Sequence, residues 1–297
     1  MKLTDAGLET ALLFEEGIDL PHFAAFPLVD IDEGRAAMRR YYEPFLELAG
    51  DRDVPLVLST PTWRANGDWG RLLGYVGDDL AAVTRRAVEF LETMQAGHDV
   101  VIEGCIGPRS DAYSPTMLMD APEAERYHAV QLRTLADTAC AHATALTLTY
   151  VDEAVGIVRA AASAGLPVHI GFTVEIDGRL PSGDSIEDAI LSVDGATDGA
   201  AESFMINCAH PTHFADALPD GDARRRIRGL RANASRLSHA ELDEAAELDS
   251  GDPDDLAERY VALRRELPEL EVLGGCCGTD IRHVTAICDA WLAADAA

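Results

Sequence analysis

The chain of 297 residues has one lysine, Lys2, and its 24 basic side chains face 52 acidic ones, which gives a formal net charge of −28. This shortage of positive charge argues against a nucleic-acid binder and against a protein that docks on anionic lipid. No apolar run approaches the roughly 20 residues that span a bilayer. A secretory signal needs an apolar N-terminal run, whereas residues 1–17 include Asp5, Glu9, Glu15 and Glu16. We therefore expect a soluble, cytoplasmic protein that binds neither nucleic acid nor membrane.

The large negative charge also bears on the solvent that suits this chain. Carboxylates hydrate strongly, and salt screens the repulsion among them, so the surface suits concentrated salt. An arginine-rich codon bias in an ordinary acidic proteome would explain the same composition. Neither explanation says anything about chemistry.

Short β-rich segments alternate with helix-like segments rich in Ala, Glu and Arg along the whole chain. With 47% hydrophobic residues the chain can bury a sizeable core, and no linker divides it. Eight strands alternating with helices over this length fit an α/β fold of the (β/α)8 TIM barrel type, with its active site at the C-terminal ends of the strands, better than a doubly wound sheet. We predict one barrel domain over residues 1–297, with a lid or side wall in the irregular stretch 234–255. The predicted strands are Leu3–Ala6, Pro55–Thr60, Asp99–Gly104, Ala145–Thr149, Pro167–Thr173, Ser203–Cys208, Arg226–Ala232 and Leu270–Gly275.

The six cysteines do not indicate a disulfide scaffold in a cytoplasmic chain of this size. Two of them fall inside predicted helices, where a small buried thiol is expected. The other four stand at or just past the ends of predicted strands, where a barrel places its reactive groups. The helical pair is Cys140 and Cys288, and the strand-end set is Cys105, Cys208, Cys276 and Cys277.

The segment GGCCGT, residues 274–279, gives the sharpest chemical signal. Its glycines relax the backbone so that Cys276 and Cys277 can turn both sulfurs to one point. A helix that begins after Thr279 would favour thiolates there. Cys208, in INCAHP, comes from the strand two places earlier, so three thiolates with an open fourth position predict a reactive zinc site. A coincidental pair of packed thiols and a strained vicinal disulfide are the alternatives.

Four segments stand in a distinctive order: DAG at residues 5–7, GCIGP at 104–108, INC at 206–208 and GGCCGT at 274–279. From Asp5 to His283 the chain resembles the zinc-dependent homocysteine S-methyltransferase family. The resemblance implies a (β/α)8 barrel and a Zn²⁺ ion held by Cys208, Cys276 and Cys277. It also implies methyl transfer from a sulfonium or other onium donor, of the S-methylmethionine or S-adenosylmethionine type, to a thiol. Homocysteine, which would become methionine, is the implied acceptor.

The same chemistry fits the residues themselves. Zinc removes the proton of a bound thiol and leaves a nucleophilic sulfur, whereas an ion that already carries three thiolates activates water poorly. A cationic donor also suits a mouth with carboxylates and aromatic rings, among them Phe172. The residues assigned to substrate binding, with the small-molecule thiol and the methyl-onium donor as partners, are Asp5, Glu9, Trp63, Thr149, Tyr150, Glu175 and Asn207.

Several of these residues have a second interpretation. The resemblance implies that Asp5 helps to hold the acceptor, but a strand-end cap is the alternative. Asn207 either orients the loop of the cysteine that follows it or serves a plain turn. We interpret His210 as a loop histidine rather than a ligand and Cys105 as a neutral lining residue.

The acceptor site departs from the family. Homocysteine-specific members carry a Glu-Thr pair in this part of the sequence, and its Glu binds the acceptor's amino group. The corresponding positions here are Leu146 and Thr147. Leucine cannot accept the hydrogen bonds of an ammonium, and an unpaired buried ammonium costs several kcal/mol. Glu175 or Glu9 would supply a replacement carboxylate, or the acceptor is a different thiol.

Other functions stay open at this point. The alternatives to homocysteine methylation are a methyltransferase for a different small thiol and a zinc- or thiol-binding barrel without methyl transfer. A zinc hydrolase or lyase would normally use histidine and carboxylate ligands, which this set of cysteines lacks. A homo-oligomer is compatible with all of these.

Overall fold

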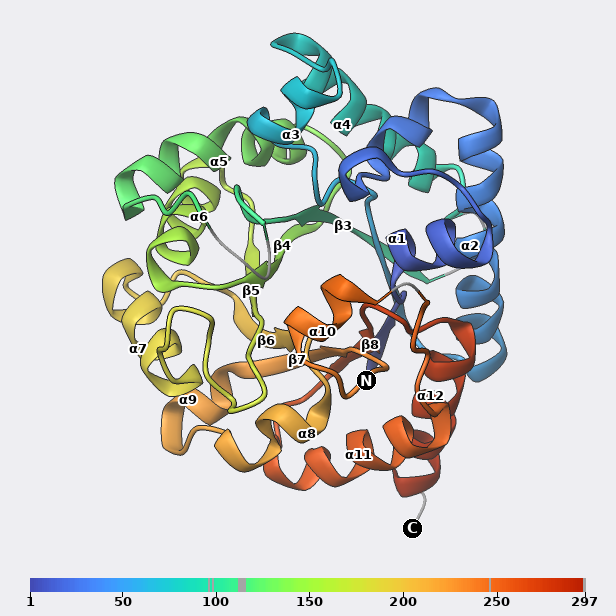
Figure 1. The fold of residues 1–297 in the computed structure, drawn as a ribbon, viewed down its shortest axis with the longest axis vertical. Helices are drawn as coiled ribbons and strands as arrows, with labels where there is room; N and C mark the ends of the chain where they lie inside the picture. The colour runs from blue at the N-terminus through green and yellow to red at the C-terminus, as the bar shows by residue number, and fades with distance from the viewer. Residues whose placement is uncertain (96, 98, 112–115, 246, 296–297) are drawn as a thin grey trace.

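Eight parallel strands form a closed barrel in the computed structural model, which describes residues 1–95, 97, 99–111, 116–245 and 247–295. Each strand pairs with the next along the chain, and β8 closes the ring against β1 through Lys2 and Val272. Figure 1 looks into the barrel, with the strands in the middle and helices around them. The (β/α)8 prediction is confirmed. The strands are β1 Lys2–Thr4, β2 Leu56–Ser59, β3 Val100–Ile106, β4 His142–Leu148, β5 Val168–Phe172, β6 Ser203–Asn207, β7 Ile227–Ala232 and β8 Val272–Gly275.

The start of β4 differs from the prediction. The strand begins at His142, upstream of the predicted Ala145. Its first residues include polar side chains, but these face a buried carboxylate: His142 Nε2 and Thr144 Oγ1 lie 3.2 and 2.5 Å from Glu103 Oε2. Cys140 was expected in a helix, yet α5 (Ala121–Ala136) ends before it, and Cys140 lies buried in the turn ahead of β4.

The outer layer consists of the longer helices, whose apolar faces pack on the strands. Helix α4 buries Leu80, Val83, Val88 and Leu91, as their spacing predicts. Helix α6 stops at Gly165, which has the left-handed φ of 71° that glycine adopts without strain. The longer helices are α2 Asp32–Arg52, α4 Asp78–Glu92, α5, α6 Val151–Ala164, α7 Ile186–Thr197, α11 Pro253–Glu266 and α12 Ile281–Asp295.

Shorter helices lie in the loops. Figure 1 shows α1 and α10 over the barrel opening rather than in the outer ring. These short α-helices are α1 Leu8–Thr10, α3 Gly67–Leu72, α8 Pro211–Phe214, α9 Gly221–Arg226 and α10 His239–Glu244. Tight helical turns also occupy Ala11–Glu15, Pro21–Phe23, Phe26–Asp30 and Ala215–Ala217.

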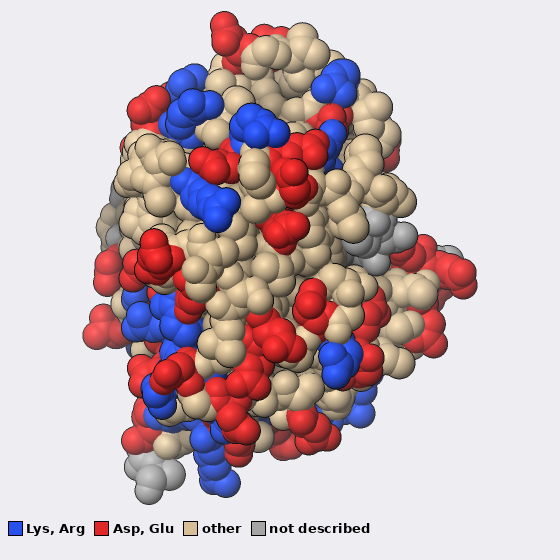
Figure 2. All heavy atoms as spheres, turned by 90° about the vertical axis from the view of Figure 1, so that its left-hand side faces the viewer, with Lys and Arg blue, Asp and Glu red and all other residues tan. Residues whose placement is uncertain are grey.

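Two further observations concern the apolar content of the helices and the charge of the surface. Among the described residues no helix is both long enough and apolar enough to cross a membrane. On the face turned to the viewer in Figure 2, acidic side chains outnumber the basic ones scattered between them, in keeping with the net charge of −28.

Candidate active site

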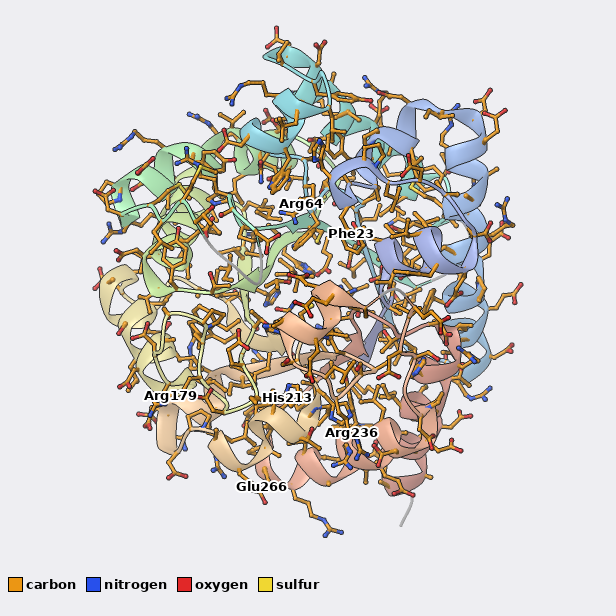
Figure 3. The ribbon with its side chains drawn as sticks, in the orientation of Figure 1. Phe23, Arg64, Arg179, His213, Arg236 and Glu266 are labelled. Atoms are coloured by element: carbon orange, nitrogen blue, oxygen red, sulfur yellow. The ribbon has the colours of Figure 1, made fainter. Side chains whose placement is uncertain are left out.

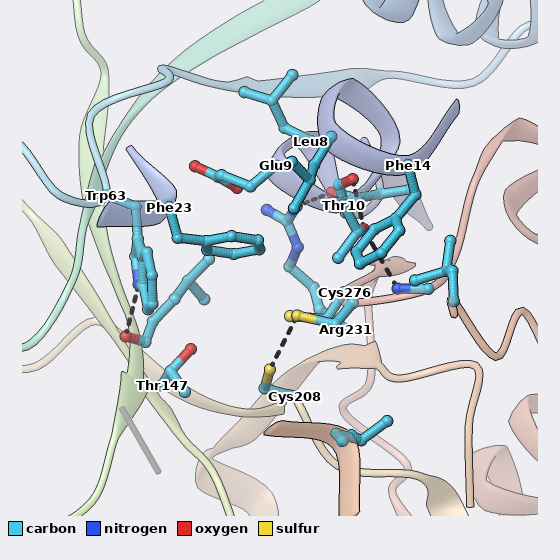
Figure 4. Close-up of a pocket in the computed structure, with 18 of the residues that line it drawn as sticks. Leu8, Glu9, Thr10, Phe14, Phe23, Trp63, Thr147, Cys208, Arg231 and Cys276 are labelled. Carbon is cyan, nitrogen blue, oxygen red and sulfur yellow. Dashed lines mark hydrogen bonds between the residues drawn. The ribbon is translucent and has the colours of Figure 1, made fainter. Parts of the chain in front are cut away.

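A cavity of about 400 Å³ opens at the C-terminal ends of the strands, where a barrel of this type carries its reactive groups. Its walls come from the segment after β1, the segment after β2, the ends of β3, β4, β6 and β7, and the loop after β8 (Figure 4). The irregular stretch after β7 forms one side through Ser235, Leu242, Asp243 and Ala245. This stretch is therefore a side wall of the cavity.

Three cysteines meet in this cavity. The sulfurs of Cys208, Cys276 and Cys277 all lie within 4.8 Å of one another, and Cys208 Sγ lies 3.5 Å from Cys277 Sγ. Cys208 is buried and the other two are half-buried, and all three line the cavity. Such a group can hold a metal ion. Figure 4 shows Cys208 and Cys276 projecting toward each other from different strand ends.

The backbone conformation at Cys208 and around the Cys276–Cys277 pair sets the direction of the three sulfurs. Cys208 has φ 56°, a left-handed conformation that costs a residue other than glycine roughly 1–3 kcal/mol. Its carbonyl accepts hydrogen bonds from Thr173 Oγ1 at 3.2 Å, Asn233 Nδ2 at 3.0 Å and His239 Nε2 at 3.0 Å. Gly278, with φ 77°, turns the chain after the cysteine pair, and a Cβ there would stand 2.8 Å from a backbone oxygen. The glycines of GGCCGT thus serve the turn that the sequence indicated.

The three thiols share protons unequally. Hydrogen bonds from Cys208 and Cys277, aided by the charge of Arg231, hold the pKa of Cys276 well below its ordinary value despite burial. The pKa of Cys277 is raised, because its hydrogen bonds with Cys208 and Cys276 favour its neutral form and burial adds to this effect. Of these two neighbouring thiols, Cys276 therefore ionises more readily than Cys277. A bound metal ion would replace the remaining protons.

A charged network lies below the cysteines, inside the barrel. Arg231, on β7, donates to Asp5 Oδ1 at 2.8 Å and to Glu103 Oε1 at 3.3 Å, and all three side chains are nearly inaccessible. Its other donors reach Ser59 Oγ at 2.7 Å and the carbonyls of Ala6 and Gly275. Every N–H of this guanidinium therefore has an acceptor, which is what a buried charge requires.

The carboxylates of this network respond differently to burial. Burial raises the pKa of Asp5 even though Arg231 lies beside it. Burial also disfavours the charged form of Glu103, but its contacts with His142 and Arg231 outweigh that effect and lower its pKa to about 2. Asp5 lines the cavity, yet its charge is already paired with Arg231.

Asn207 connects the two halves of the site. Its side chain accepts from the backbone N–H of Thr147 and donates to Thr147 Oγ1, each at 2.9 Å, and Nδ2 lies 3.9 Å from Cys276 Sγ. Thr147 has φ 65°, at the point where the pairing of β4 with β5 shifts. Leu146 and Thr147, the two positions that correspond to the family's Glu-Thr pair, both line the cavity that the three cysteines line.

Glu9 and several aromatic rings form the upper wall. Glu9 lines the cavity, and burial raises its pKa to about 7, with the nearby Cys276 and Asp5 adding to the rise. No other side chain among the described residues pairs with its carboxylate. Trp63 donates to the Leu146 carbonyl at 3.3 Å and meets the Phe23 ring edge-on at 6.4 Å.

Four of the predicted site residues lie elsewhere. Thr149 is fully buried, and Phe172 stacks on Phe204 in the core. The hydroxyl of Tyr150 accepts from the Met119 N–H at 3.1 Å. Glu175 Oε1 lies 3.2 Å from His239 Nδ1, so its carboxylate is engaged behind the α10 wall. None of the four is among the described residues that line the cavity, and Asn207, fully buried at the end of β6, does not line it either.

Two further predictions concern single residues. His210 caps α8, where its Nδ1 accepts from the Thr212 N–H at 3.3 Å, and it does not join the cysteines. Cys105 lines the cavity within a small apolar cluster with Leu146, Met205 and Trp63, and burial raises its pKa well above the ordinary value. It is a neutral thiol there, as expected.

Sequence reasoning missed Phe23, Arg64 and Arg231. Phe23 follows His22 in a turn where both residues have left-handed φ values, and no sequence signal indicates this. Arg64 lies over the rings of Trp63 and Trp69 at 4.4 and 4.1 Å, and Figure 3 shows it beside Phe23 near the barrel opening. Arg231 could have been found, because a cation inside a buried strand must have anionic partners.

Comparison with known proteins agrees with this geometry. A family model described as homocysteine S-methyltransferase matches residues 2–291. No curated protein sequence matches the chain. Among solved structures, the oxidized form of the homocysteine methyltransferase MmuM from Escherichia coli is similar, with 15% identity, 97% of this chain and 94% of that chain covered, and a TM-score of 0.76. Its metallated form has 16% identity, coverage of 97% and 95%, and a TM-score of 0.71.

At such low identity the structural likeness concerns the fold. The family model, by contrast, covers nearly the whole chain and includes all three clustered cysteines. This chain belongs to the homocysteine S-methyltransferase family and is an S-methyltransferase.

Proposed function

We propose that the protein is a zinc-dependent methyltransferase in which Cys208, Cys276 and Cys277 hold one Zn²⁺. The observation that carries this proposal is the meeting of three sulfurs within 4.8 Å at a cavity. Thiolates are the ligands that zinc accepts readily, and the lowered pKa of Cys276 favours metal binding. Bound zinc lowers the pKa of an acceptor thiol and keeps it a nucleophilic thiolate at neutral pH.

The methyl donor is a small sulfonium or other onium compound. In the reaction the acceptor sulfur forms a bond to the methyl carbon, and the bond from that carbon to the donor heteroatom breaks. The bonding electron pair stays on the departing neutral molecule, and the acceptor thiol releases its proton. The cavity suits a cationic donor, because the rings of Trp63 and Phe23 and the carboxylates of Glu9 and Asp243 all line it.

Homocysteine is the proposed acceptor, with Glu9 as the partner of its ammonium group. Leu146 stands at the position of the family's Glu and offers no hydrogen-bond acceptor in its side chain. Asp5 already neutralises Arg231. Glu175 contacts His239 rather than the cavity. Glu9 lines the same cavity as Cys276.

A substrate panel tests this assignment. Turnover is measured with homocysteine and with the matching thiol that lacks the amino group, in wild type, Glu9→Gln and Glu15→Gln. Glu15 is exposed on the same segment and serves as the control. A charge-assisted hydrogen bond of about 1.5–3 kcal/mol predicts that Glu9→Gln raises the KM for homocysteine about 10- to 100-fold and leaves the amine-free thiol unaffected.

Three other outcomes are informative. Wild-type protein that prefers the amine-free thiol would show that the acceptor is a different thiol. Equal losses on both thiols in Glu9→Gln would assign Glu9 to the donor. Purified protein that binds zinc and transfers no methyl group to any thiol would overturn the proposed function.

A further inference from the structure

The carbonyl of Cys208 is the point where the cysteine cluster meets the α10 wall. Two of its three hydrogen-bond donors, Thr173 and Asn233, directly follow the strands β5 and β7. The third, His239, is the first residue of α10. A helix over the cavity thus contacts the backbone of a proposed metal ligand.

His239 is held from both sides. Its side chain is 4% exposed, with Nε2 on the Cys208 carbonyl at 3.0 Å and Nδ1 at 3.2 Å from Glu175 Oε1. Glu175 follows β5 and so belongs to the barrel frame. The Cys208 carbonyl and the Glu175 carboxylate are both acceptors, so both contacts are hydrogen bonds when both ring nitrogens carry a proton, and together they fix the plane of the ring. The imidazole is therefore aimed at the carbonyl.

The segment that carries His239, residues 235–245, also forms the cavity wall described above. Its N-terminal end is fixed by a capping box between Ser238 and Glu241 and by the Ser235 hydroxyl, which donates to Asp249 at 2.6 Å. Leu242 and Asp243, one turn along the helix from His239, face the cavity. The same helix therefore presents one face to the substrate space and one residue to Cys208.

We propose that His239 is a positioning residue that holds Cys208 in its left-handed conformation and couples metal binding at the three cysteines to the ordering of residues 235–245. The inference rests on the proposed zinc site. Metal binding fixes the Cys208 sulfur, and the sulfur and the carbonyl belong to one residue with a constrained backbone. An ordered carbonyl gives His239 a fixed acceptor, which keeps α10 over the cavity. By thermodynamic reciprocity, an ordered α10 tightens metal binding.

His213 supplies a matched control. Its Nε2 lies 2.9 Å from the Arg236 carbonyl, so it also tethers the segment 235–245, but it does not contact Cys208. Figure 3 shows His213 and Arg236 on the outer side of α10, away from the labelled Phe23 and Arg64. His213→Ala therefore loosens the same segment without touching the proposed ligand.

The first measurement is the zinc dissociation constant, by competition with a chromophoric chelator, in wild type, His239→Ala, His239→Gln and His213→Ala. Removal of a group that supports a metal ligand typically weakens binding about 10- to 100-fold, which we expect for His239→Ala. His239→Gln keeps an N–H near the position of Nε2 and should restore most of the affinity. His213→Ala should weaken zinc binding much less than His239→Ala, because it loosens the segment but keeps the contact with Cys208.

The second measurement is amide hydrogen exchange of residues 235–245 with and without zinc. Zinc should protect this segment in wild type and in His213→Ala, and should give no added protection in His239→Ala. If His239→Ala does not fold, Glu175→Gln tests the same contact, because it removes the carboxylate that orients the ring and should weaken zinc binding. Unchanged zinc affinity and zinc-dependent protection in folded His239→Ala, or in Glu175→Gln where His239→Ala does not fold, would overturn the proposal. Wild-type protein without zinc affinity would instead overturn the proposed function.

Discussion

Replacement of Arg231 by methionine tests the buried network under the cysteines. The substitution keeps an apolar side chain in the barrel and removes the cation that pairs with Asp5 at 2.8 Å and Glu103 at 3.3 Å. Breaking a buried pair by removing one partner costs about 3–5 kcal/mol, because the remaining charge has no compensation. With an unfolding entropy of about 2.1 cal/mol/K per residue over 297 residues, this free energy corresponds to a fall in Tm of about 5–8 °C.

The pH dependence of this loss has a definite sign. In wild type the pKa of Glu103 is lowered to about 2, so its ionisation stabilises the fold above the ordinary pKa, and that stability is lost as pH falls toward 2. Without Arg231, the pKa of Asp5 rises further, because burial loses its main opposing charge, and the ionisation of Asp5 opposes folding as pH rises, whereas Glu103 keeps its contacts with His142. The difference between variant and wild type should therefore be larger at pH 7 than at pH 5.

Thermal and urea unfolding at both pH values provide the assay, with Arg52→Met as the control. Arg52 donates to Asp289 at 2.7 Å, but both side chains are largely exposed, so its loss should cost no more than about 1 kcal/mol. Equal losses for the two variants, or a penalty for Arg231→Met that does not shrink at pH 5, would refute the reasoning.

Four shorter predictions follow from the site and the surface. Cys276→Ser or Cys277→Ser should lose most of the bound zinc, because a hydroxyl replaces a soft thiolate poorly; metal analysis with full occupancy would contradict this. Chelation should abolish methyl transfer and leave the far-UV circular dichroism intact, since eight strands and their helices bury the core without the metal; cooperative unfolding on chelation would make the site structural. Molar potassium chloride should raise Tm, because 52 carboxylates repel one another, and a flat or falling Tm would remove the salt-adaptation hypothesis. The kcat/KM for homocysteine should rise with pH through about 7 as Glu9 ionises, and the part of this rise due to Glu9 should vanish in Glu9→Gln; identical profiles would exclude that role.

The barrel could be predicted because its signal is local and repeated. Buried parallel strands such as PVHIGFTV read as apolar runs, and the helices between them show their apolar stripe over several turns. The same repetition places GGCCGT and INC at the C-terminal ends of predicted strands. When the sheet closes into a barrel, these strand ends lie around the same opening. The contact between Cys208 and Cys277 could thus be expected before any coordinates, although the sequence positions are far apart.

The substrate residues could not be assigned with the same success, because strand-end position does not say which way a side chain points. Thr149, Tyr150 and Glu175 follow strands as Cys208 does, yet packing turns them away from the cavity. Phe23 enters the cavity through a turn that no local pattern announces.

The sequence by itself determined the fold class, the order of the strands and the grouping of Cys208, Cys276 and Cys277, since each follows from periodicity and from residues adjacent to strand ends. Only the tertiary structure decided that Arg231 neutralises Asp5, that Glu9 faces the cysteines and that His239 contacts Cys208. These are contacts between segments far apart in the chain. Their existence depends on register, side-chain direction and burial, which no single segment encodes.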